Sequence, residues 1–437
     1  MSKIVVIGMG QGGMVAAIKL AEQGHSVCVY EQSEKGAVSY DWTDDIRSEI
    51  FEHCNLPMPS EEIYFQKNKW VFVSPNEKHR LPVPPCPPME EISIYRRGLS
   101  EYFANLAQQA GCAIHYGAKV EKLLFNGDRV CGICANGREI PCDLVIDASG
   151  MRSPFRAQLP SRFGVQAQPE NAGVLYTYRA FFKRTEGADP VIKGINSTVI
   201  LKHLGGKGIG WCNLADENTV DVLIGRIEKL TDDEIKKSLA SLSAYNPILS
   251  DELISERRVE VCLRASIARA VADGYIAIGD SAYMTMPIMG SGIEASMNAG
   301  KDFAAFVVEN KITDFSASNM WKFYADYMRN AGSGFALIDV LKRWALGLDA
   351  KWIDWLFGSG IVTEDNLAAV STDENAKVKI SAKAVFKILA KPSFVFSALG
   401  CLSRGLKASR CAKHVPKRYD EKRLAKWQKK YEKRLHG

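Results

Sequence analysis

Long apolar runs are missing from this sequence of 437 residues. No run approaches the ~18 residues that a membrane-spanning helix needs. The apolar residues Ile4–Ile7 follow the initial Met1-Ser2-Lys3 directly, which leaves no room for a secretory signal peptide. We therefore expect a cytoplasmic protein without a membrane-spanning helix.

Patterns typical of metal sites and hydrolases are also missing. The 11 cysteines have no regular spacing, and the seven histidines form no H-x-x-x-H pattern, so we expect reduced thiols and no metal site. Cys131 and Cys134 form a C-x-x-C, but they lie in a strand-like stretch, where positions i and i+3 face opposite sides. We interpret this pair as structural. No G-x-S-x-G motif suggests a hydrolase.

Charge is unevenly distributed along the chain. The composition, with 46% hydrophobic and 24% charged residues, is ordinary for a globular protein and excludes a disordered or collagen-like chain. The formal net charge is +6, but residues 401–437 alone carry 13 Lys and Arg against three Asp and Glu. The rest of the chain is therefore mildly acidic. This asymmetry predicts that the tail meets an anionic surface.

The pattern of strands and helices predicts an α/β fold that a second sheet interrupts. Residues 4–7 and 26–30 read as buried strands and residues 14–22 as the helix between them, a βαβ unit that predicts a parallel sheet. We expect a Rossmann-like dinucleotide-binding domain with an inserted antiparallel β-sheet substrate domain and a helical C-terminal region. The predicted boundaries are 1–62, 89–165 and 258–310 for the first domain, 63–88 and 166–257 for the β-sheet domain, 311–376 for the helical region and 377–437 for a basic amphipathic tail.

A glycine-rich turn joins the first strand to the first helix. It reads Gly8-Met9-Gly10-Gln11-Gly12-Gly13 and matches G-x-G-x-x-G, with the acidic Glu31 at the end of the next strand. Gly8 permits the tight turn, Gly10 lets a pyrophosphate approach the backbone, and Gly13 allows close packing of helix and strand. The helix N-terminus offers N–H groups to phosphates, and Glu31 can accept hydrogen bonds from ribose hydroxyls. This context predicts a dinucleotide site.

A second segment resembles a flavin signature. It begins Gly279-Asp280-Ser281-Ala282 and continues with Pro287, Gly290, Gly292 and Ile293. The order and spacing resemble the G-D-A-x(5)-P-x-x-G-x-G segment of FAD-dependent oxidoreductases of the hydroxylase and geranylgeranyl reductase superfamily. The resemblance implies FAD, with Asp280 on the ribityl chain and the helix after Gly292 pointing at the N1–C2=O edge of the flavin. A helix N-terminus suits that edge because reduced flavin carries negative charge there.

Three shorter matches lie between these segments. Arg96 and Leu99 resemble an R-x-x-L segment whose Arg sits near the pyrophosphate. Val120 stands at the position of a strand residue whose backbone contacts the adenine in members of the superfamily. Ala148-Ser149-Gly150 resembles the "DG" segment, with Ser in place of the usual Asp. The resemblance as a whole implies that the following residues bind the cofactor: Gly8, Gly10, Gln11, Gly12, Gly13, Met14, Glu31, Gln32, Arg96, Val120, Ala148, Ser149, Gly150, Gly279, Asp280, Pro287, Gly290, Ser291, Gly292 and Ile293.

The substrate side of the site has fewer sequence signals. The geranylgeranyl reductase branch carries a Y-x-W-x-F-P segment, of which only Trp211 is present here, and the Cys-Gly pair of many members is absent from residues 38–45. In that loop Trp42 could stack on a flat group and Asp45 could bind a polar one. Alternatively, Thr43 caps a helix whose first turn holds Asp44 and Asp45. Trp211, Trp42 and Asp45 are the substrate-site candidates, and no catalytic residue can be named.

The reaction that the resemblance implies is reduction. There is no second G-x-G-x-x-G after a strand, so a separate nicotinamide domain is not expected. By resemblance to the geranylgeranyl reductase family, reduced FAD would deliver hydride from N5 to a C=C bond of an apolar or lipid-like substrate, with NAD(P)H or ferredoxin as electron donor. Two alternatives stay open: an FAD-dependent monooxygenase of an aromatic or apolar substrate, and a non-enzymatic flavin-bound membrane adaptor. Flavin-dependent halogenases also have a Ser-Gly form of the "DG" segment, but they combine it with a W-x-W-x-I-P segment that this sequence lacks, so they fit less well.

The basic tail begins with a lysine stripe. Lys379, Lys383, Lys387 and Lys391 repeat every four residues, with apolar residues largely on the other side of the predicted helix, and a second apolar stretch covers 394–402. This pattern is typical of a helix on an anionic bilayer. The alternative is a helix pair that packs on the body. Nucleic acid is not an expected partner because no aromatic-interleaved basic platform is present.

Overall fold

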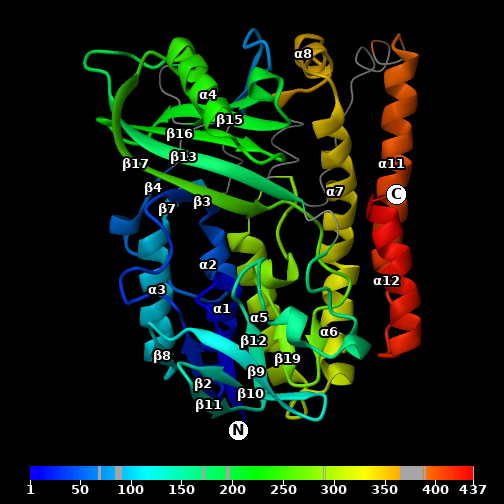
Figure 1. Ribbon diagram of the computed structural model, residues 1–437. Helices are drawn as coiled ribbons and strands as arrows, with labels where there is room; N and C mark the ends of the chain where they lie inside the picture. Colours follow the sequence, from blue (N-terminus) through cyan, green and yellow to red (C-terminus); the bar gives the residue numbers. More distant parts are fainter. Residues whose placement is uncertain are drawn as a thin grey trace.

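A computed structural model describes residues 1–66, 70–83, 91–169, 173–192, 197–288, 290, 292–364, 387 and 390–436. Figure 1 shows three parts: a nucleotide-binding fold in the lower half, a large antiparallel sheet above it, and a row of long helices along one side. The arrangement confirms the predicted fold class of an α/β domain with an inserted antiparallel sheet and a helical C-terminal region.

The lower part is built on a six-stranded sheet with the order β18-β19-β12-β1-β2-β8. Strand β1 pairs in parallel with both β2 and β12, which confirms the predicted βαβ unit. The strands are β1 (Lys3–Ile7), β2 (Ser26–Tyr30), β8 (Ala113–His115), β12 (Leu144–Asp147), β18 (Val271–Ala272) and β19 (Tyr275–Ala277). Its helices are α1 (Gln11–Glu22), α3 (Arg96–Gln109) and α5 (Ile293–Glu309). Strands from three distant parts of the chain, residues 3–30, 113–147 and 271–277, thus form one sheet.

A three-stranded antiparallel sheet flanks this core. It contains β9 (Val120–Asn126), β10 (Arg129–Ala135) and β11 (Arg138–Pro141), joined by turns at Asn126-Gly127 and Asn136-Gly137. Cys131 and Cys134 both lie on β10, which confirms the strand predicted for this C-x-x-C. Single-turn 3-10 helices follow at η2 (Arg156–Gln158) and η3 (Ser161–Phe163).

The inserted sheet has seven strands in the order β17-β13-β16-β15-β14-β5-β6. They are β5 (Trp70–Val73), β6 (Arg80–Val83), β13 (Val174–Arg184), β14 (Ser197–Leu201), β15 (Gly208–Leu214), β16 (Thr219–Arg226) and β17 (Leu249–Cys262). The pairing is antiparallel except between β5 and β14. Helix α4 (Asp232–Tyr245), which begins with a capping box at Thr231 and Glu234, packs Ile235 and Leu242 on the outer face, and η4 (His203–Gly205) precedes β15. The inner face is turned toward the nucleotide-binding fold (Figure 1).

A small sheet connects these two parts. It consists of β3 (Thr43–Arg47), β7 (Glu91–Tyr95) and β4 (Tyr64–Gln66), with α2 (Glu49–His53) and η1 (Glu61–Ile63) between them. The expectation that Thr43 caps a helix is therefore wrong. All five residues of β3 pair antiparallel with β7, so a strand partner about 50 residues away overrides the local capping pattern.

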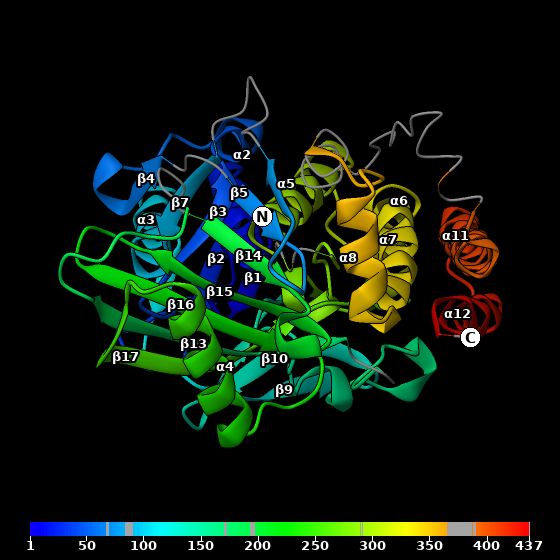
Figure 2. The same cartoon turned by 90° about the horizontal axis from the view of Figure 1, so that it is seen from above.

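The C-terminal helices lie side by side along the body. They are α6 (Ala317–Arg329), α7 (Ala331–Gly347), α8 (Ala350–Gly358), α11 (Pro392–Lys413) and α12 (Glu421–His436). Figure 2 shows α11 and α12 together at the outer edge, with α7 between α11 and the rest of the molecule. No helix among these described residues is long and apolar enough to cross a bilayer.

Both tail helices pack on the body. Helix α11 contacts α7, and Cys401 donates to Val340 O at 3.6 Å. On α12, Tyr431 donates to Ser266 O and Glu432 pairs with the fully buried Arg264 at 3.3 Å. One face of α11 therefore packs on the body, as does α12, whereas most of the lysine-striped helix predicted at 379–391 lies outside the described residues.

Candidate functional site

The glycine turn after β1 is pressed against the end of β12. Gly8 has a left-handed backbone with φ +83°, and a Cβ at Gly10 would lie 2.7 Å from Ala148 O. A Cβ at Gly13 would lie 2.4 Å from Ala148 Cβ. We expected Gly10 to make room for a pyrophosphate; it also makes room for the neighbouring strand. No described side chain caps α1, so the N–H groups of its first turn have no side-chain acceptor at Gly10.

Glu31 stands beside this turn, immediately after β2. Its side chain is buried, with Oε2 accepting from Met9 N at 3.0 Å and Oε1 from Ser33 N at 2.8 Å. A carboxylate has about four acceptor positions, so capacity remains for hydroxyl donors. The backbone O of Glu31 accepts from Ala118 N, which brings the start of β9 at Val120 to the same place.

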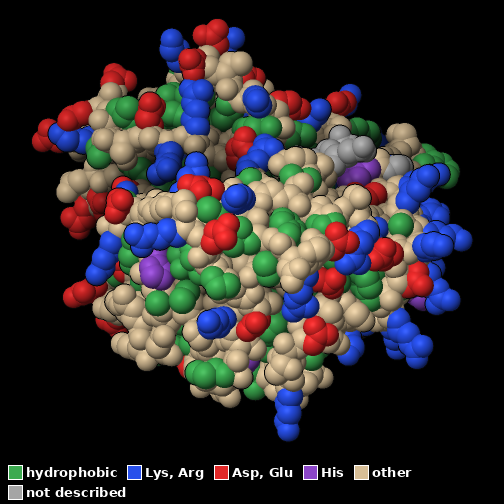
Figure 3. All heavy atoms as spheres, turned by 60° about the horizontal axis from the view of Figure 1, so that its bottom comes forward, with side chains coloured by type: hydrophobic (Ala, Val, Ile, Leu, Met, Phe, Trp, Pro, Cys, Tyr) green, Lys and Arg blue, Asp and Glu red, His purple; other side chains and the backbone are tan. Residues whose placement is uncertain are grey.

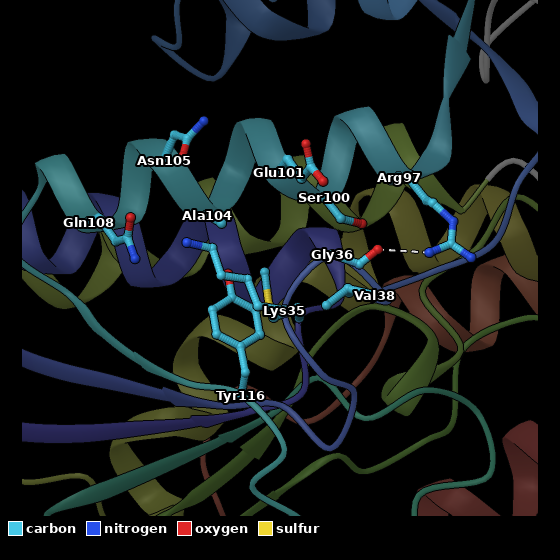
Figure 4. A pocket seen from close by; sticks show the side chains of 11 residues that line it. Lys35, Gly36, Val38, Arg97, Ser100, Glu101, Ala104, Asn105, Gln108 and Tyr116 are labelled. Atoms are coloured by element: carbon cyan, nitrogen blue, oxygen red, sulfur yellow. Dashed lines mark hydrogen bonds between the residues drawn. The ribbon is translucent and has the colours of Figure 1, made fainter.

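A cavity of about 270 Å³ opens next to Met9, whose backbone N–H donates to Glu31. Figure 4 shows side chains of α3 along one wall, with Tyr116 and the loop that follows Glu31 along the other. Arg97 donates to Gly36 O at 2.7 Å across the end of the cavity. The lining residues include Lys35, Gly36, Val38, Arg97, Ser100 and Tyr116. Sequence reasoning missed this cavity, although Arg97 adjoins the predicted Arg96.

The flavin-like segment meets the glycine turn through two helices. A Cβ at Gly12 would lie 2.6 Å from Ser296 O, and one at Gly300 would lie 2.0 Å from Gly12 O. Because these glycines let α1 and α5 approach to backbone contact, motifs about 270 residues apart lie side by side. Asp280, in η5 (Gly279–Ala282), accepts from Thr285 Oγ1 at 2.6 Å and lies next to Gly292, at the start of α5.

The remaining predicted cofactor residues surround these helix ends. Arg96 is the first residue of α3 and lies close enough to Asp280 for their charges to interact. Ala148, Ser149 and Gly150 follow β12, whereas Ser291 lies outside the described residues. Gln32 adjoins Glu31 on the surface, and Gln11 and Met14 begin α1. Pro287 and Gly290 lie in the loop before α5.

A buried carboxylate that the sequence did not single out holds these loops together. Asp147 is fully buried at the end of β12. Its Oδ1 accepts from Ser149 Oγ at 2.6 Å and Ser281 Oγ at 3.2 Å, and its Oδ2 accepts from Ser153 Oγ and Tyr275 OH, both at 2.5 Å. Burial and the charge of Asp147 raise the pKa of Tyr275 well above its usual value, so the phenol stays a donor. Ser149 therefore serves as an anchor for Asp147.

The predicted aromatic candidates converge under the large sheet. Arg179, on β13, lies over the ring of Trp42 at 4.9 Å and over that of Trp211 at 5.6 Å. The guanidinium binds Asp221 with two hydrogen bonds of 2.9 and 2.8 Å and donates to Thr43 O at 2.8 Å. Arg179 and Asp221 were not predicted. Their bidentate pair is buried and joins the sheet to the loop that carries Trp42.

The two neighbouring acids of β3 have different surroundings. Asp45, the predicted candidate, accepts a short hydrogen bond from Ser93 on β7. Asp44 instead lies 3.3 Å from Arg96 Nε and 4.0 Å from Arg179 Nη1. Burial raises the pKa of Asp44, and the charges of Arg96 and Arg179 oppose that rise. Asp44 thus lies between Arg96 at the start of α3 and Arg179 on the large sheet.

Known proteins share this organisation. The family model described as "FAD binding domain" matches residues 1–307. A digeranylgeranylglycerophospholipid reductase of Haloferax volcanii is 24% identical over 72% of this chain and 79% of that protein. The Sulfolobus acidocaldarius protein of the same name is 22% identical over 90% of this chain and 88% of its own. A geranylgeranyl bacteriochlorophyll reductase-like structure from Thermoplasma acidophilum has a TM-score of 0.73 at 20% identity, over 92% of this chain and 99% of that one.

Proposed function

The chain belongs to the FAD binding domain family and has FAD as its cofactor, and on this basis we propose that it is an oxidoreductase that reduces a C=C bond of an apolar, lipid-like substrate. When bound and reduced, FAD supplies a hydride from N5. The proposal is supported by the names of the relatives, which act on digeranylgeranylglycerophospholipids. It is also supported by the two tryptophans Trp42 and Trp211, whose rings lie 4.9 and 5.6 Å from the same Arg179 guanidinium.

The shape and charge of the site fit the cofactor. The uncapped start of α1 suits the pyrophosphate, and the remaining acceptor capacity of Glu31 suits a ribose. The cavity beside Glu31, with Lys35 and Tyr116, has the chemistry of an adenosine monophosphate site. Asp280 would hold the ribityl hydroxyls, and the start of α5 at Ile293 would face the flavin edge. Arg96 would compensate phosphate charge, and Asp147 would keep the surrounding loops in place.

The residues of the substrate side fit an amphiphile better than a small polar molecule. Trp211 is partly exposed and offers apolar surface, Trp42 is buried close to it, and the Trp211 indole N–H is buried without an acceptor among the described residues. Tyr40 lies between two cationic side chains, with Arg96 at 5.0 Å and Arg257 at 5.5 Å from its ring. A long apolar chain against Trp211 and an oxygen-rich group near Arg257 would satisfy both features.

Redox titration of the purified flavoprotein tests this proposal. The FAD-loaded protein is reduced with dithionite without oxygen and then mixed with unsaturated isoprenoid glycerophospholipids. We expect flavin reoxidation that depends on the substrate and a product with two more hydrogens. Trp211→Ala should raise KM with a smaller change in kcat. Trp211→Phe should bring KM back close to that of the wild type. If no acceptor reoxidises the flavin, the assay is repeated with O₂. Substrate-coupled O₂ uptake would then establish the monooxygenase, and no substrate-dependent turnover in either assay would leave the adaptor alternative in place of the enzyme.

We also propose that the protein is cytoplasmic and works at an anionic membrane surface that it reaches through residues 377–437. The charge of residues 401–437 and the lipid-like substrate support this location. Electrons would come from NAD(P)H or ferredoxin, and stopped-flow reduction with each donor would identify the one that reduces the flavin.

A further inference from the structure

The outer face of α11 carries an apolar stripe. Its members are Phe396, Leu399, Leu402 and Leu406, with exposed fractions of 76%, 57%, 42% and 48%. At about 100° per residue these four side chains fall within one third of the helix circumference. The opposite side of α11 is buried against α7 through Cys401, Gly405 and Ala408. The stripe is thus a second apolar face of a helix whose first apolar face is already used.

Basic residues surround this stripe and continue onto α12. Lys407, Arg410 and Lys413 are exposed along the C-terminal half of α11. The exposed side of α12 presents only cations among its charged residues: Lys422, Arg423, Lys426, Lys429, Lys430, Lys433 and Arg434. The two acids of α12 are engaged elsewhere, Glu421 with Arg162 at 2.9 Å and Glu432 with Arg264. Figure 3 shows Lys and Arg side chains gathered along the edge formed by these helices.

An aromatic cluster marks the end of α11 where the stripe begins. The ring of Phe394 lies 5.5 Å from Trp344, 5.2 Å from Trp352 and 5.4 Å from Trp355. All three tryptophans are only partly buried, the state in which indoles favour a membrane–water interface. Figures 1 and 2 place α8 and the start of α11 at the end of the molecule that holds the large sheet.

The same end is tied to the substrate sheet. Asp354 on α8 accepts from Asn76 N at 2.9 Å, in the turn between β5 and β6. Lys202, which follows β14, donates to Leu346 O at 2.7 Å near the end of α7. A surface that binds the stripe would therefore hold the inserted sheet next to it.

We propose that the α11 stripe, with the basic face of α12, docks the protein on an anionic phospholipid bilayer and holds the substrate sheet at the lipid surface. The apolar side chains enter the headgroup boundary while the lysines and arginines bind lipid phosphates. Charge complementarity selects a bilayer over a second copy of this chain, because two such faces would bring their cations together. This inference sharpens the membrane association proposed above, yet its test needs no turnover.

Vesicle co-sedimentation of the full-length FAD-loaded protein tests the docking face. We expect binding to phosphatidylcholine vesicles that contain phosphatidylglycerol and little binding to phosphatidylcholine alone. Leu399→Gln with Leu406→Gln should weaken binding about tenfold or more, since both leucines lose burial in lipid. The matched control is Leu253→Gln with Ile254→Gln, which changes two side chains of similar exposure on β17 and should leave binding unchanged.

A charge-reversed pair on α12 tests the electrostatic part of vesicle binding. Lys426→Glu with Lys430→Glu should abolish the preference for anionic vesicles, and added salt should weaken the wild type in the same way. Equal binding by the stripe variant and its control would overturn the proposal. The proposal would also be overturned if light scattering showed a dimeric wild type and a monomeric stripe variant, because a second copy of the chain would then cover the stripe. Flavin absorbance and reoxidation by a detergent-dispersed acceptor should be the same in all variants, which separates this result from a failure of the proposed reaction.

Discussion

A methyl group at position 13 tests the packing that joins the glycine turn to the sheet. In Gly13→Ala the new Cβ would lie 2.4 Å from Ala148 Cβ and 2.9 Å from Val6 Cγ1, both on buried strands or their ends. Approaches this close force α1 to move, and overpacking of this kind costs about 1–3 kcal/mol. Alanine also favours a helix over glycine by about 1 kcal/mol, which offsets part of that cost.

Gly334→Ala is the matched control for the gain in helix propensity when glycine is replaced by alanine. Gly334 lies within α7, and a Cβ there would meet nothing within 4 Å. We expect this variant to be stabilised by about 0.5–1 kcal/mol, and the difference between the two variants to give the packing cost.

Two measurements follow each variant. Urea unfolding of the FAD-free proteins gives the difference in stability, and flavin fluorescence on release gives the FAD dissociation constant. We expect Gly13→Ala to be less stable than Gly334→Ala by about 1–3 kcal/mol and to bind FAD more weakly, because the start of α1 has moved. Equal stability and equal FAD affinity of the two variants would refute the reasoning.

Three further changes test other parts of the molecule. Burial and the charge of Arg226 lower the pKa of His203 to about 4. Between about pH 6.5 and pH 4 the unfolded chain therefore binds a proton that the native protein does not, and the stability falls over this range by on the order of 3 kcal/mol. In His203→Gln the urea midpoint should depend much less on pH over the same range. Glu432→Gln removes the counter-charge of the buried Arg264 and should lower stability by about 1–3 kcal/mol in thermal unfolding. Arg97→Ala should weaken FAD binding about tenfold in fluorescence titration if the adenosine lies in the cavity beside Glu31, and unchanged affinity would place it elsewhere.

The local motifs were readable from the sequence because each is complete within a short stretch. The turn from Gly8 to Gly13 specifies its own conformation, and Glu31 follows at the end of the next strand. The same reasoning failed at Thr43, where a plausible cap is part of β3 because β7 supplies a strand partner much later in the chain. Local propensity is a weak guide where distant pairing competes with it.

The contacts that depend on tertiary structure were not readable. Arg179 and Asp221 lie 42 residues apart on neighbouring strands, and only the register of β13 and β16 makes them partners. Asp147 gathers the hydroxyl groups of Tyr275 and Ser281 from more than 120 residues away, and nothing in the sequence next to Asp147 indicates these partners. Amphipathic patterning indicated that the tail has an apolar face but not which surface covers it. The structure assigns one face of α11 to α7 and leaves the stripe exposed.

The most direct test of the proposed reaction is the composition of the product. The FAD-loaded protein is supplied with its electron donor and an unsaturated isoprenoid glycerophospholipid in the presence of isotopically labelled O₂, and the lipid is analysed by mass spectrometry. The proposed reductase adds two hydrogens to the lipid and no label. Incorporation of a labelled oxygen atom into the lipid would contradict the proposal and establish a monooxygenase.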